Sequence, residues 1–262
     1  MKKTLIALAV AASAVVSGSA MAAGWEQNGT GGSVDLGGTL TPVEKVTPWE
    51  VKMGSEITGL DASIGRGQKV VEVKMPKDAL IMAIRTQTKD AFPGGASDIT
   101  PSIDFNGAVN LDSFSNGVAT LTLDVKQGES KIGTMQALFQ SGAEASFRGE
   151  GDDANKYTLF APRMGNAFFG GLSKTAEGAS QYGYTIAKRY DAEVVANYNE
   201  QNLDGEAIKG EISFNDGVKT YSGIYGAGIP GDSSIVITLD QAASSDAPIQ
   251  WKASLPVTVS YN

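Results

Sequence analysis

The sequence WKASLPVTVSY, residues 251–261, alternates apolar and polar side chains throughout its length. A period of two puts every second side chain on one face of a β-strand, so this stretch predicts a terminal strand with one buried face. Such a strand is either the last strand of an ordinary sheet or the edge of a cleft that another segment fills. The predicted buried face carries Trp251, Ala253, Leu255, Val257, Val259 and Tyr261.

A second alternating stretch, GSVDLGGTL at residues 32–40, lies near the other end of the chain. It is either the first strand of a monomeric sandwich or a strand that is donated to the sheet edge of a neighbouring subunit. Its place just after a predicted export leader favours a polymer-forming protein over an enzyme. The residues expected to enter the neighbour are Gly32, Val34, Leu36, Gly38 and Leu40.

The first 22 residues have the three parts of a secretory signal peptide. Lys2 and Lys3 precede an apolar, alanine-rich run, and Ala20-Met21-Ala22 fits the small-residue cleavage rule. Residues 1–22 are therefore expected to be removed during export, and residues 23–41 to form an N-terminal donor extension. The remaining residues, 42–262, are expected to form one folded domain.

Composition excludes several classes of function. The chain has no histidine and no cysteine, which removes the commonest general base, the commonest metal ligand and any disulfide. Its formal net charge of −8 disfavours nucleic acid, which needs a basic surface. We therefore expect a binding or structural protein with no metal, no cofactor and no catalytic residues.

The middle of the chain is predicted to be all-β. There are 32 glycines, and short alternating runs are separated by clusters of turn residues, as in a β-sandwich. Ile212 and Phe214 lead into Asn215-Asp216-Gly217, which predicts a hairpin that returns through residues 218–225. Further strands are expected around residues 71–75, 79–84, 103–105, 119–125, 132–139 and 235–239.

The segment at about 156–207 breaks this rhythm and is expected to be a small lobe inserted into the sandwich. The spacing of Ile186, Tyr190, Val194 and Tyr198 at every fourth position predicts one short helix there. Its aromatic side chains either pack the lobe onto the sandwich or contact a sugar, since tyrosine is common at interfaces. The possible receptor contacts are Tyr182, Tyr184, Lys188, Arg189 and Tyr190.

Several of these stretches resemble the Fae-type subunits of the κ class of chaperone–usher fimbriae. The leader MKKTLIALA, the stretch at residues 32–41, and LFA at residues 159–161 carry part of the resemblance. FFGGL at residues 168–172 and the tail from residue 250 carry the rest, so that the resemblance covers both ends of the chain and patches between them.

The resemblance implies an incomplete immunoglobulin-like β-sandwich, which the N-terminal strand of the next subunit completes. It also implies a periplasmic chaperone, an outer-membrane usher and a fimbria on the bacterial surface. In this family the major subunit can itself bind a host glycoconjugate, whereas minor subunits serve assembly. The lobe departs from the major adhesin, which favours a minor subunit; the alternatives are the major adhesin, a small outer-membrane barrel or a secreted lectin.

Overall fold

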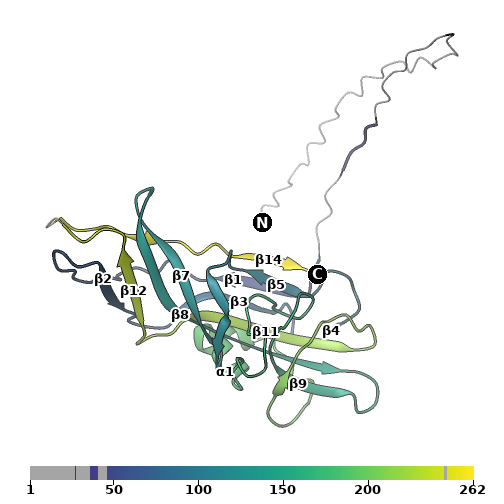
Figure 1. Ribbon diagram of the computed structural model, residues 1–262. Helices are drawn as coiled ribbons and strands as arrows, with labels where there is room; N and C mark the ends of the chain where they lie inside the picture. Colours follow the sequence, from purple (N-terminus) through teal and green to yellow (C-terminus); the bar gives the residue numbers. More distant parts are fainter. Residues whose placement is uncertain (1–26, 28–35, 41–45, 245–246) are drawn as a thin grey trace, which may run out of the picture. The chain divides into compact units, whose positions relative to one another are not determined.

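The computed structural model describes residues 27, 36–40, 46–244 and 247–262. It divides the chain into two units, residues 1–44 and residues 45–262. The described residues of the second unit are mostly β-strand, with one short α-helix (Figure 1). The mostly β fold and the short helix agree with the prediction from the sequence.

The described elements follow one another along the second unit as strands, a short helical region and further strands (Figure 1). They are β1 (Trp49–Met53), β2 (Val70–Lys74), β3 (Ala79–Thr86), β4 (Phe92–Pro93), β5 (Pro101–Asp104), β6 (Val109–Ser115), β7 (Val118–Gln127), β8 (Ser130–Arg148), β9 (Ala154–Leu159), the helix α1 (Gly183–Tyr190), the 3₁₀ turn η1 (Ala192–Val195), β10 (Ile208–Gly210), β11 (Thr220–Ile229), β12 (Ser234–Leu239), β13 (Lys252–Ala253) and β14 (Thr258–Tyr261).

Two sheets organise these strands. The larger sheet runs in the order β1-β3-β11-β8-β12-β2, and β7 joins β8 to β6 and to β13. Every pair in it is antiparallel except β9 with β10. The smaller sheet consists of β5 and β14. The C-terminal segment therefore contributes β13 to the larger sheet and β14 to the smaller one.

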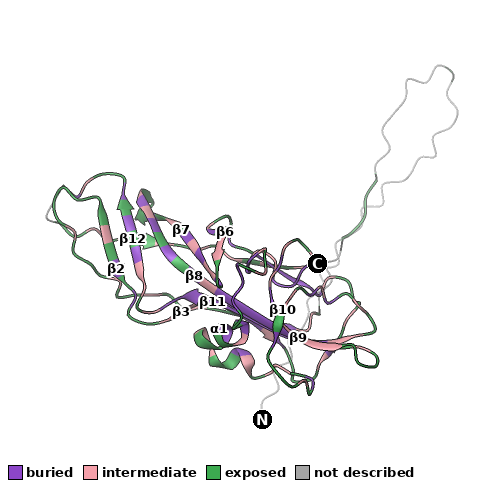
Figure 2. Cartoon of the chain, turned by 60° about the horizontal axis from the view of Figure 1, so that its bottom comes forward, coloured by how far each residue is buried: buried purple, intermediate pink, exposed green. Residues whose placement is uncertain are grey.

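The core is built around β8 and β11, which are buried over much of their length (Figure 2). One face of these strands meets the main apolar core and the other meets α1. Close approach of the helix depends on Gly226, because a Cβ there would lie 2.7 Å from the Cα of Ala187. Burial on both faces explains why apolar and polar side chains do not alternate in residues 141–147 of β8.

Most of the predicted strands are confirmed, among them those at residues 71–75, 79–84, 119–125 and 235–239. The hairpin predicted at Asn215-Asp216-Gly217 is wrong. Ile212 and Phe214 are buried but lie outside the strands, because Phe214 turns into an aromatic cluster and its carbonyl accepts a hydrogen bond from the N–H of Gly95. β11 then begins at Thr220.

The single helix predicted in the lobe is divided into α1 and η1. Asp191 separates them with an extended backbone, and its side chain accepts a hydrogen bond from the N–H of Glu193. An aspartate in this position caps the following turn rather than continuing a helix. Two of the four residues that recur at every fourth position, Ile186 and Val194, are buried, as expected for one apolar face.

Candidate strand-acceptor site

The C-terminal segment has the alternation predicted from its sequence, but its inward side chains are incompletely covered. Each apolar side chain of the predicted face packs against the main core, and each remains only partly buried. The polar residues between them are exposed. In the interior strands of the same domain, comparable side chains such as Val125 and Ile235 are fully buried. One side of the tail face therefore still meets solvent.

The backbone of the tail is also incompletely paired. Ala253 pairs with Val125 at one end, and residues 258–261 pair with β5 at the other. Among the described residues, Ser254 to Val257 have no strand partner and no backbone hydrogen bond to another backbone group. Pro256 has no N–H, but its neighbours have donors and acceptors that an added strand could pair.

β5 pairs with β14, the last part of the candidate acceptor strand. Beyond the Tyr261–Pro101 pair, Asn262 exchanges two backbone hydrogen bonds of 3.0 Å with Thr100. On the opposite edge of β5, the N–H of Phe168 donates to the carbonyl of Pro101 and the N–H of Ile103 donates to the carbonyl of Phe169. β5 is thus held between β14 and the segment that contains FFGGL.

The FFGGL stretch at residues 168–172 is shaped to lie against β5. Phe168 is fully buried at a φ of 59°, a conformation rare for a bulky residue and maintained by its surroundings. Its ring stacks on Tyr225 with a centroid distance of 5.3 Å. Gly170 has a φ of 84°, and a Cβ at this position would collide with the carbonyl of Ile103. These features explain why the FFGGL sequence can lie directly against β5, the strand that pairs with β14.

Trp49, the first residue of β1, contacts both the segment that leads into β5 and the FFGGL stretch. Its indole Nε1–H donates a buried 2.6 Å hydrogen bond to the carbonyl of Ile99, two residues before β5. Its ring meets Phe168 edge to face at 5.7 Å and also lies against Phe92 and Phe214. Trp49 is the first residue of β1, so this contact joins the start of β1 to the segment that leads into β5.

The candidate donor residues lie partly within the described residues. Leu36 and Leu40 are 94% and 98% exposed and belong to no strand. A Cβ at Gly38 would meet no atom within 4 Å. Gly32 and Val34 lie outside the described residues. Two large apolar side chains of the alternating set are therefore available to a partner.

The possible receptor residues occupy different surroundings on the lobe. Arg189 bonds both oxygens of Asp78, and the hydroxyl of Tyr190 donates to the Gln140 side chain at 2.9 Å. Burial raises the pKa of the Tyr190 hydroxyl well above its usual range. These two side chains therefore fix α1 to β8 and to the loop before β3.

The remaining three are Tyr182, Tyr184 and Lys188. Tyr182 is 65% exposed. The Lys188 ammonium lies 5.9 Å from the ring centre of the half-buried Tyr184. The structure does not gather all five candidates into one cavity.

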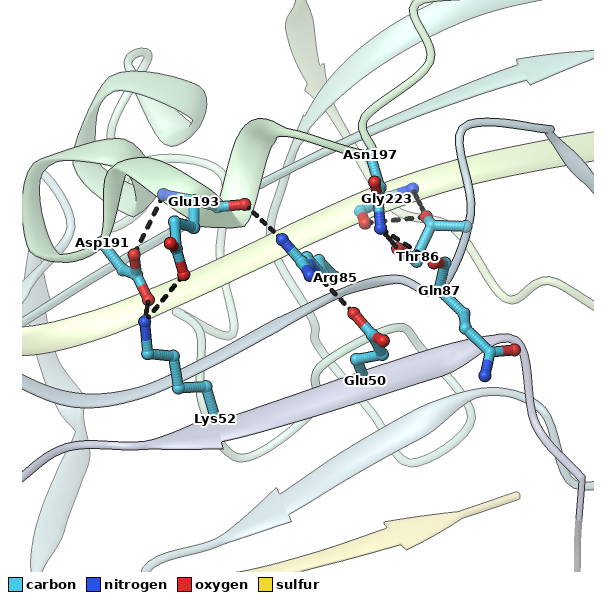
Figure 3. A network of polar contacts seen from close by, with 9 residues as sticks. All are labelled: Glu50, Lys52, Arg85, Thr86, Gln87, Asp191, Glu193, Asn197 and Gly223. Atoms are coloured by element: carbon cyan, nitrogen blue, oxygen red, sulfur yellow. Dashed lines mark hydrogen bonds and ion pairs between the residues drawn. The ribbon is translucent and has the colours of Figure 1, made fainter. Parts of the chain in front are cut away.

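A polar pocket of about 410 Å³ lies between β1 and η1. Lys52 pairs with Asp191 at 2.7 Å and with Glu193 at 3.2 Å across this pocket (Figure 3). Arg85 donates to the carboxylate of Glu50 and to the backbone carbonyl of Glu193. Each cation is already paired within the chain, and the contacts tie the edge strand β1 to the lobe.

Within the described residues, no group of three or more acidic, histidine or cysteine side chains is placed to hold a metal ion. No helix in the described part is long and apolar enough to cross a membrane.

The incompletely paired C-terminal segment, the exposed residues 36–40 and the mostly β fold are compatible with a structural subunit. The whole chain, residues 1–262, matches the family described as "Fimbrial, major and minor subunit" of the K88 type. The chain belongs to this family of fimbrial subunits, which are non-enzymatic components of surface fimbriae.

Curated relatives from Escherichia coli match along their entire length. The chain is 30% identical to "K88 fimbrial protein AB" over 301 residues and 29% identical to "K88 fimbrial protein AC" over 295 residues, with all of each chain covered. It is 27% identical to "F41 fimbrial protein" over 285 residues, again with full coverage of both chains. The family resemblance inferred from the sequence is confirmed.

The sequence identified the tail and the FFGGL motif but not what connects them. Trp49 lies in no alternating apolar run, so its role escaped the sequence analysis. A buried tryptophan flanked by Pro48 and Glu50 gives only the weak signal that its N–H requires a partner when the ring is buried. The partner is a backbone carbonyl of Ile99, which sequence patterns do not identify.

Proposed function

We propose that the chain is a fimbrial subunit whose immunoglobulin-like sandwich is completed by a strand donated from the next subunit. The observation that supports this most is the half-covered row of apolar side chains along residues 251–261, next to unpaired backbone at Ser254 to Val257. An unpaired edge of this kind invites an added strand, which supplies main-chain hydrogen bonds and alternate side chains.

The donated strand in this proposal is Gly32 to Leu40. Leu36 and Leu40 are exposed in the described chain, which matches a segment that must become buried in a partner. Together with Val34, these side chains would each contribute about 1.5–3 kcal/mol on burial. Gly38 would fit where the acceptor face leaves little depth.

The two ends of the folded unit support an antiparallel donor strand. Asn262 pairs with Thr100, and Trp49 bonds to the neighbouring Ile99, so the tail ends close to the first strand of the folded unit. A donor strand antiparallel to the tail would place consecutive subunits end to end. With a parallel donor strand, the folded unit of the donating subunit would instead lie at the end where the arm of the accepting subunit leaves.

The same exposed edge requires protection before assembly. In this proposal a periplasmic chaperone pairs with the tail strand after export, and an outer-membrane usher exchanges it for the arm of the next subunit. The half-covered side chains of Leu255, Val257 and Val259 support a partner strand that contacts every second residue of the tail. The arm then replaces the chaperone without any covalent step.

We also propose that this chain occupies a minor position in the fimbria. Of the five lobe residues considered for receptor contact, Arg189 and Tyr190 are used to hold α1 against Asp78 and Gln140. That use supports an assembly role over host-glycan binding. Quantitative mass spectrometry of purified fimbriae tests this, since a minor subunit is far less abundant than the main one; equal abundance would contradict it.

The principal experiment is size-exclusion chromatography of the chain from residue 23 onward, with and without a synthetic peptide of residues 32–40. We expect self-associated or unstable protein alone and a stable 1:1 complex with the peptide. A stable monomer that ignores the peptide would refute donor-strand completion.

A deletion of Ala23 to Leu40 supplies the complementary test. The acceptor face remains intact in this variant, so it should still bind the chaperone. It should fail to enter fimbriae because it has nothing to donate. Incorporation of the deletion variant at the normal level would be incompatible with the proposed role of the arm.

A further inference from the structure

We propose that Trp49 is a positioning residue for the acceptor strand, so that the seating of β1, the first strand after the arm in sequence, affects how readily a subunit accepts the arm of another. This inference rests on the proposed donor-strand function and adds to it a residue outside both the donor and the acceptor segments. The juxtaposition that carries it is Trp49 against Ile99, next to the Thr100–Asn262 pair.

β14 has little support of its own. It pairs only with β5 among the described strands, and two strands alone form a marginally stable sheet in water. The geometry of β14 therefore depends on what holds β5. The inward side chains Val259 and Tyr261 are only half buried, which leaves the sheet short of apolar contacts on that side.

Trp49 holds β5 through two separate contacts. Its Nε1–H satisfies the carbonyl of Ile99 at 2.6 Å in a buried environment. Its ring lies edge to face against Phe168, whose own N–H donates a 2.7 Å hydrogen bond to the carbonyl of Pro101 in β5. Loss of the indole N–H would leave a buried carbonyl without its partner, directly before the acceptor pairing.

The same residue begins β1, the first described strand that follows the arm in sequence. From Trp49 to Met53, β1 pairs residue by residue with β3 as far as Met82. Coupling of this kind is reciprocal at equilibrium. A filled acceptor site should stabilise the β1 register, and a correctly seated Trp49 should strengthen binding at the acceptor site.

The test compares the wild-type chain with Trp49→Phe, which keeps an aromatic ring and removes the N–H. Phe92→Leu is the matched control, because Phe92 also contacts the Trp49 ring, at 5.2 Å, but pairs with β11 rather than with β5. The readouts are the affinity for the labelled peptide of residues 32–40 and amide hydrogen exchange at residues 258–262.

We expect Trp49→Phe to weaken peptide affinity by about tenfold, the effect of one buried hydrogen bond, and to speed exchange at residues 258–262. Phe92→Leu should lower the melting temperature without this selective effect. Equal affinity and exchange in wild type and Trp49→Phe would overturn the inference while leaving donor-strand completion standing. Failure of the peptide to bind wild type would instead refute the proposed function.

Should Trp49→Phe fail to fold, the wild-type chain alone decides the matter. Peptide binding should then slow amide exchange at residues 49–53 more than at residues 154–159, which pair with β8 and β10 away from β5. Equal slowing in the two strands would overturn the coupling.

Discussion

The guanidinium of Arg189 bonds both carboxylate oxygens of Asp78, at 2.9 Å from Nε and at 2.7 Å from the second nitrogen. Asp78 also accepts a hydrogen bond from the N–H of Gly231. The hydrogen bonds from Arg189 hold the pKa of Asp78 below its usual range. One carboxylate thus joins the last turn of α1 to the loop before β3 and to the turn before β12.

Removal of this pair should loosen the lobe. We expect Arg189→Ala to lower the free energy of unfolding by about 1 kcal/mol, a modest value because both side chains are partly exposed. Urea denaturation measures the loss. Lys188→Ala is the neighbouring control, since Lys188 makes only a loose contact with the Tyr184 ring. An equal loss in both variants would contradict a specific role for Arg189.

Glu144 provides a pH test. Its carboxyl is buried beneath the lobe, and burial raises its pKa, although the Lys156 ammonium lowers it. A carboxyl with a raised folded-state pKa is bound to a proton more strongly in the folded chain, so its contribution to stability falls as pH rises above about 4.3. Glu144→Gln should therefore be more stable than wild type at pH 8 and lose that advantage near pH 4.

Denaturation midpoints across this pH range measure the Glu144 effect. Glu150→Gln is a suitable control because Glu150 is exposed in the turn after β8. A Glu144→Gln curve that stays parallel to wild type from pH 4 to pH 8 would show that the carboxyl does not titrate differently on folding.

Alanine substitutions at Gly165 and Gly170 distinguish the cost of backbone strain from the cost of a steric collision. Both have positive φ, 84° and 89°, but only a Cβ at Gly170 would collide with the carbonyl of Ile103. Gly165→Ala should therefore cost about 1 kcal/mol from backbone strain alone. Gly170→Ala should cost at least about 3 kcal/mol and weaken donor-peptide binding, because it displaces β5. Similar losses in the two variants would argue against the fitted contact.

Donor peptides test the predicted face of the arm. A Leu36→Ser change in the peptide of residues 32–40 should reduce affinity at least thirtyfold, since about 2 kcal/mol of apolar burial is lost. Thr39→Ala, on the opposite face, should change affinity less than threefold. Titration against the chain by fluorescence anisotropy distinguishes them. A larger effect at Thr39 would mean that the opposite face of the arm enters the acceptor.

Local alternation predicted much of this fold because single-faced strands repeat every two residues. It identified β12, β7 and the inward face of the tail. It could not show that β8 continues to Arg148, because residues 141–147 are buried on both faces and lose the period. The Asp191 break between α1 and η1 was missed because a local side-chain hydrogen bond outweighed the apolar spacing.

The candidate site was accessible to the sequence only in part. Alternation specifies which side chains of residues 251–261 point inward, and it holds in the structure. It does not specify the partner strand, which depends on long-range pairing such as Thr258 with Asp104. The contribution of Trp49 depends on a side-chain donor meeting a backbone carbonyl 50 residues away.

The closeness of Trp49 to the end of the tail also has a mechanical consequence. If subunits are joined by donated strands as proposed, a pull on one subunit reaches the next through its acceptor strand and leaves through its arm. Within a subunit, β14, β5, Ile99 and Trp49 connect these two points by a short route. Tension would bypass α1 and η1, so the lobe could change its surface through evolution without weakening the filament.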